Sequence, residues 1–112
     1  MNLRINGQEL RFRISKGELE SLCKGEELEQ ISYLPNNHNL TTKITTEAAS
    51  YGLFLIIKNN RFVLHVNHKT AKDFLESLPS REGLEATQEI NDELSLKLFL
   101  EVDIRTQKRK RS

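Results

Sequence analysis

The 112-residue chain has one cysteine, no tryptophan and no apolar run long enough to cross a membrane. A single thiol, Cys23, excludes an intrachain disulfide, and no metal-ligand spacing surrounds it. The longest apolar run, residues 53–57, has the length of a strand, whereas a membrane helix needs about 18 residues. The N-terminus lacks the apolar core of a signal peptide, so we expect a cytoplasmic protein.

Charge is nearly balanced, at +1 overall, but it is unevenly distributed. Five of the 17 lysines and arginines fall within residues 105–111, which leaves residues 1–104 with 12 basic and 16 acidic side chains. We therefore predict one acidic domain over residues 1–104, followed by a basic flexible tail over residues 105–112.

Residues 10–25 carry the clearest local signal, a strand that leads into a capped helix. Apolar residues and arginines alternate from Leu10 to Ile14, which is the period of a half-buried strand. Ser15 and Glu18 have the spacing of a capping box at a helix start, and Gly25 favours the left-handed conformation that ends a helix.

Before this strand, Asn6-Gly7 separates two alternating runs and predicts a hairpin turn. With those two residues as the loop, Leu3 faces Leu10 and Arg4 faces Glu9.

The same order of elements returns in the second part of the chain. A shift of 52 residues places Phe12 on Leu64 and the cap Ser15 on Asn67, although few residues are identical. We predict an α+β fold, mostly antiparallel β, in which two ββαββ halves, about 1–47 and 53–104, form a curved eight-strand sheet or barrel with two helices. The alternative is two unrelated units that resemble each other by chance.

Residues 1–15, the Glu18-Leu19 helix start and the segment Glu101-Val102-Asp103-Ile104 resemble a group of small uncharacterised bacterial proteins, a domain of unknown function. That group combines a basic alternating N-terminal hairpin with a closing Glu-x-Asp segment, in which an aromatic residue is expected where Ile104 stands. The resemblance implies a small bacterial cytoplasmic domain and supplies no activity, ligand or catalytic residue.

Charged residues share the polar side of the first hairpin and the last long strand: Arg4, Arg11, Arg13, Lys97, Glu101 and Asp103. If this face lay inside a closed barrel, it could hold a phosphorylated ligand by guanidinium forks and a divalent cation by carboxylates. The alternative is a solvated outer face.

The tail residues Arg105, Lys108, Arg109, Lys110 and Arg111 would attract nucleic acid weakly and without sequence preference. The acidic body and the lack of tryptophan favour a tail that is merely solvated.

The sequence favours a non-enzymatic binding or interaction module that acts through a sheet face, with a protein partner or a second copy of itself. Residues 53–57, apolar on both faces, are either covered by a helix or part of such a docking patch together with Phe99. We predict no catalytic residue, cofactor or membrane contact. The dispersed His38, His65 and His68 predict no metal site.

Overall fold

The computed structural model describes residues 1–48 and 52–107, which form eight strands and three helices. In chain order these are β1 (Asn2–Asn6), β2 (Glu9–Ile14), α1 (Lys16–Cys23), β3 (Leu28–Leu34), β4 (His38–Glu47), β5 (Leu53–Lys58), β6 (Arg61–Asn67), α2 (His68–Ser77), β7 (Leu84–Glu89), β8 (Ser95–Val102) and α3 (Ile104–Gln107). No helix within these described ranges is both long and apolar enough to cross a bilayer.

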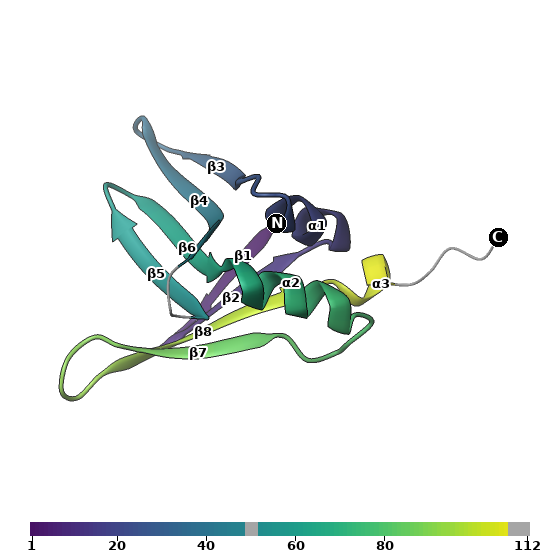
Figure 1. Cartoon of the computed structure of the whole chain (residues 1–112). Coiled ribbons are helices and arrows are strands. Elements are labelled where there is room, and N and C mark those ends of the chain that lie inside the picture. The colour runs from purple at the N-terminus through teal and green to yellow at the C-terminus, as the bar shows by residue number, and fades with distance from the viewer. Residues whose placement is uncertain (49–51, 108–112) are drawn as a thin grey trace.

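The strands form two sheets of four. Sheet A has the order β1-β2-β8-β7 and sheet B has the order β3-β4-β6-β5. Each sheet consists of two antiparallel hairpins whose inner strands, β2 with β8 and β4 with β6, pair in parallel. The sheets diverge toward the left of Figure 1, while the helices gather at the opposite end.

The predicted repeat is a pseudo-twofold relation that holds residue by residue. A shift of 52 residues carries Phe12 onto Leu64, and every register pair of β1–β2 recurs in β5–β6. A shift of 56 residues carries Ile44 onto Leu100 and relates β3–β4 to β7–β8. Accordingly Phe12 lies beside Leu100 in sheet A, and Leu64 lies beside Ile44 in sheet B. The halves therefore interlock, because each sheet takes one hairpin from each half.

The continuous antiparallel sheet or barrel expected from the sequence is not formed. The inner strands of the hairpins pair in parallel across the two halves, so each sheet ends at four strands, and β1, β3, β5 and β7 are edges. Alternation along β2 requires Phe12 to face inward, but it does not specify the direction of the neighbouring strand.

The core lies between the inner faces of the sheets and under α1 and α2, which pack on each other and on β4 and β6. Every second residue of β2 from Leu10 and of β8 from Leu98 is buried there, and α1 and α2 each add two buried apolar side chains. The predicted capping box is confirmed, since the amide of Glu18 donates to the Ser15 hydroxyl and the Glu18 carboxylate accepts from the Ser15 amide.

Three local predictions are corrected. The first turn is Gly7-Gln8, with Gly7 at φ +58°, so Arg4 lies opposite Arg11. Strand β5 is not covered on both faces by a helix, because its outward Ile56 is 46% exposed, while Leu53 and Leu55 on its other face are buried. The predicted tail begins as α3, which includes residues 105–107. Residues 49–51 of the connection between the halves lie outside the described residues.

Candidate functional site

The polar face singled out in the sequence is the outer face of sheet A. The alternation that buries Phe12 turns its neighbours Arg11 and Arg13 to the other side of β2. Antiparallel pairing places Arg4 of β1 opposite Arg11, and parallel pairing places Glu101 of β8 beside Arg13. The face points away from the apolar core, so it is the solvated outer face of the two alternatives and not the interior of a closed barrel.

Arg11 is held firmly at the centre of this face. Its Nη1 lies 2.9 Å from Oε2 of Glu101, and its Nη2 lies 3.5 Å from Oε1 of Glu9. The guanidinium carbon sits 4.0 Å from the ring centroid of Phe99, a cation–π contact. Ion pair and ring together fix the orientation of the guanidinium.

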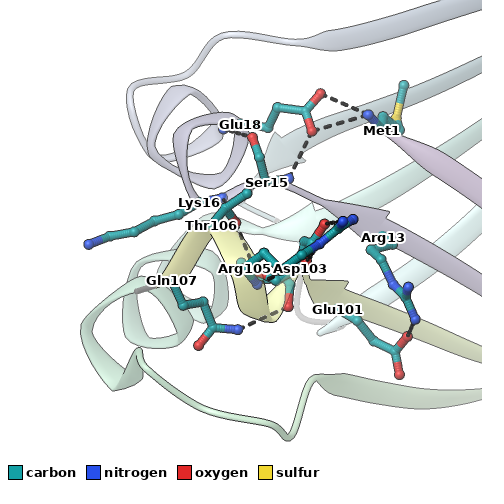
Figure 2. Close-up of polar contacts among 11 residues, drawn as sticks. Met1, Arg13, Ser15, Lys16, Glu18, Glu101, Asp103, Arg105, Thr106 and Gln107 are labelled. Carbon is teal, nitrogen blue, oxygen red and sulfur yellow. Dashed lines mark hydrogen bonds and ion pairs between the residues drawn. The ribbon is translucent and has the colours of Figure 1, made fainter. Parts of the chain in front are cut away.

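Arg13 and Arg4 are less constrained. Nη2 of Arg13 is 3.9 Å from Oε1 of Glu101, and the arginine side chain is 53% exposed (Figure 2). Arg4 is exposed and has no ion pair with any described residue. Arg4, Arg11, Arg13, Glu101 and Asn2 line one small hollow. Arg4 and Arg11 carry like charges on opposite strands, and their repulsion destabilises the folded state. An oxyanion bound between these guanidiniums would offset that repulsion.

Two of the expected site residues stand apart from the hollow. Lys97 lies beside Glu9, at the far end of the β2–β8 pair from Arg13. Asp103 follows β8 and begins α3; its Oδ1 accepts from the Arg105 amide at 3.0 Å, and its Oδ2 lies 3.2 Å from Nη2 of the same arginine (Figure 2). The bonds from Arg105 hold the pKa of Asp103 below its usual value. Both carboxylate oxygens of Asp103 are therefore already engaged by Arg105, although Asp103 lines a depression together with Arg13.

Helix α3 ties the end of the domain to its body. The Gln107 side chain, in a residue only 5% exposed, accepts from the Ser80 amide at 2.6 Å and donates to the Val102 carbonyl at 2.9 Å. The Lys16 amide donates to the Thr106 hydroxyl at 3.0 Å (Figure 2). Sequence reasoning missed these contacts, for which an Asp before a short helix is the only signal. The remaining tail residues, Lys108, Arg109, Lys110 and Arg111, lie outside the described residues.

The outer face of sheet B differs in its charge. Three of its basic side chains lie against carboxylates: Lys43 against Glu27 at 3.0 Å, Arg61 against Glu29 at 3.8 Å, and His65 against Glu47 at 3.0 Å. Exposed apolar side chains lie toward its two edges, with Tyr33 of β3 82% exposed and Ile56 of β5 46% exposed. Only sheet A therefore combines clustered guanidiniums with spare hydrogen-bonding capacity.

Metal and thiol chemistry have little geometric basis within the ranges 1–48 and 52–107. No group of three or more His, Cys, Asp or Glu side chains among these residues converges on one point. Burial raises the pKa of the Cys23 thiol, and Lys72 only partly offsets this effect. The thiol form is therefore favoured over the reactive thiolate.

The sequence profile of a family of unknown function (DUF7009) matches residues 1–111, and the chain belongs to that family. The match confirms the resemblance to a domain of unknown function, while origin in bacteria stays a prediction. No curated protein and no solved structure gives a significant match.

Proposed function

For this member of a family of unknown function, we propose a role as a non-enzymatic binding module whose sheet A outer face binds an acidic segment of a partner protein. The observation that carries the proposal is the cluster of Arg4, Arg11 and Arg13 around one hollow, in which, among the residues that the structure describes, Arg4 lacks an ion pair and Arg13 has only a long one. Guanidinium forks match the geometry of a carboxylate.

Each arginine has a distinct part in this mechanism. Arg11, fixed by Glu101 and Phe99, forms the base of the hollow and costs little to order on binding. Arg4 and Arg13 flank it and supply the free donors that contact an incoming carboxylate.

The charge on the rest of the face favours a discrete acidic segment over a long polyanion. Glu85 and Glu89 of β7 lie on the same outer side, opposite Phe99 and Ser95 respectively. These carboxylates would repel a phosphate backbone laid across the whole sheet, whereas a short segment along β1 and β2 avoids them.

Fluorescence anisotropy with a labelled peptide that carries three glutamates tests this proposal. We expect Arg4→Gln and Arg13→Gln each to weaken binding about tenfold, because exposed charged hydrogen bonds are partly screened. Arg13→Lys keeps the charge but loses the fork, and it should still weaken binding. Lys97→Gln is the matched control, since it removes one positive charge from the same face away from the hollow. Equal losses in the control and the arginine variants would show nonspecific attraction and refute the proposal.

A second candidate function is nucleic-acid association through the basic tail. It is favoured by the basic sequence of residues 108–111, which directly follow α3 in the chain. A chain that ends at Gln107 keeps α3, and we expect it to lose retention of single-stranded RNA while it keeps the acidic peptide. Unchanged RNA retention would rule out the tail.

A further inference from the structure

A groove opens between the two sheets on one side of the molecule, between the edge strands β1 of sheet A and β3 of sheet B. It has a volume of about 390 Å³, and it is lined by Leu3 and Ile5 of β1, Gln30 and Ser32 of β3, and Leu40 and Thr42 of β4, among others. Volumes of this size are typical of sites that bury a small ligand or a few side chains.

The opposite side of the molecule, related by the pseudo-twofold, is closed. There the edge strands β5 and β7 lie side by side, and Gln88 of β7 joins them. Its Oε1 accepts from the Leu55 amide at 2.8 Å, and its Nε2 donates to the Leu55 carbonyl at 2.9 Å. The amide N–H and the carbonyl of Leu55 therefore both point off the free edge of β5.

The open side has the same backbone without this side chain. The shift of 52 residues carries Leu3 onto Leu55, and the shift of 56 carries Ser32 onto Gln88. By this equivalence the Leu3 amide and carbonyl point off the free edge of β1 into the groove. Serine is too short to reach them, and among the described residues no element outside sheet A bonds to either group.

Two further replacements make the open side polar. Gln30 stands where the closed side has Ala86, and Thr42 stands where it has Leu98. The apolar equivalents help to seal the closed side, whereas the polar ones give the groove wall hydrogen-bonding groups. The pseudo-symmetry is thus broken at three neighbouring inward positions, which are Ser32, Gln30 and Thr42. At each of them the residue on the open side leaves room or hydrogen-bonding groups for a ligand, whereas its equivalent helps to close the other side.

We propose that this groove binds an extended segment of a partner protein through a glutamine side chain that takes on Leu3 the place of Gln88 on Leu55. A carboxamide both donates and accepts a hydrogen bond, so it can pair with the carbonyl and the amide N–H that one residue exposes at a strand edge. A glutamate in the same place would set a carboxylate against the Leu3 carbonyl, which offers no proton. Apolar residues two positions before and after the glutamine, which share its face of the extended segment, would pack on Leu3, Ile5 and Leu40. This inference does not depend on the arginine face.

The chain itself supplies a probe, the synthetic peptide Leu-Glu-Ala-Thr-Gln-Glu-Ile of residues 84–90, which carries Gln88 in its native context. In ¹⁵N NMR titrations of the full chain, we expect this peptide to shift the amide resonances of Leu3 and Ser32. A control peptide with glutamate in place of that glutamine should bind at least about tenfold more weakly, the loss expected for one buried hydrogen bond to a charged or unpaired group. Equal affinity of the two peptides, or no movement of the Leu3 amide, would overturn the proposal.

A variant of the chain tests the same geometry from the other direction. Ser32→Gln should place the chain's own carboxamide on Leu3, and we expect it to reduce peptide affinity at least tenfold, while Ser32→Ala keeps it. Undiminished binding to Ser32→Gln would contradict the proposal. The comparison of the two peptides uses the unaltered chain and so decides the matter even if the variant fails to fold. Dimerisation in sedimentation with no peptide response would assign the groove to a second copy of the chain and overturn the proposal.

Discussion

Gln88→Ala is expected to be among the most destabilising single polar substitutions in this domain. It removes both hydrogen bonds between β7 and β5 and leaves the Leu55 amide and carbonyl without partners in a partly buried position. An unsatisfied buried group costs about 1–3 kcal/mol, and the two groups here are only partly buried, so we expect a loss of about 2–4 kcal/mol. With an unfolding entropy of about 2.1 cal/mol/K per residue, a chain of this length should melt about 8–17 °C lower.

Thermal unfolding followed by circular dichroism measures this loss. The matched control is Ser32→Ala, which alters the pseudo-equivalent position where no such bonds exist, and a shift below about 2 °C is expected for an exposed surface change. If both variants melted at the same temperature, Gln88 would not join the sheets as described.

Three further outcomes follow from the local contacts. Ser15→Ala removes the N-cap of α1 and should cost about 1 kcal/mol in urea unfolding, whereas Ser21→Ala in the same helix, which leaves the cap intact, should cost less. The raised pKa of Cys23 predicts slower alkylation by iodoacetamide at pH 8 than N-acetylcysteine shows, and an equal rate would contradict the burial of the thiol. The lowered pKa of Asp103 means that its carboxylate stabilises the fold above the unfolded-state pKa, and that this contribution is lost as pH falls through the folded-state pKa. Asp103→Asn should therefore melt below the unaltered chain at pH 7, with a gap that narrows toward pH 3; a constant gap would count against the ion pair with Arg105.

Local chemistry in the sequence was enough to predict most elements, but not how they pair. The alternation around Phe12 and the Ser15 cap depend on neighbours in the chain, whereas the 52-residue repeat emerges from comparing the two halves of the sequence, and the structure shows all three. The neighbour of Phe12 in sheet A is Leu100, and the residues of β2 would be buried equally well beside a parallel or an antiparallel strand. Strand direction was therefore not accessible from burial patterns.

The same limit applies to the candidate sites. The sequence alone predicts that four residues share one face, because side chains alternate between the two faces along each strand: Arg4, Arg11, Arg13 and Glu101. Separating Lys97 from this group requires the register of β2 on β8, which is a long-range property. Gln88 gave a weaker signal, a lone amide at an inward position of a strand, whose partner becomes visible only when the two sheets meet.

The proposed binding role of the arginine face is tested most directly by NMR of the arginine side chains. In a titration with the triglutamate peptide at low salt, we predict that the Nε–Hε resonances of Arg4 and Arg13 move together with the amide of Asn2, while amides on the outer face of sheet B stay fixed. Resonance changes spread evenly over both sheets, or confined to sheet B, would contradict the assignment of the partner site to sheet A.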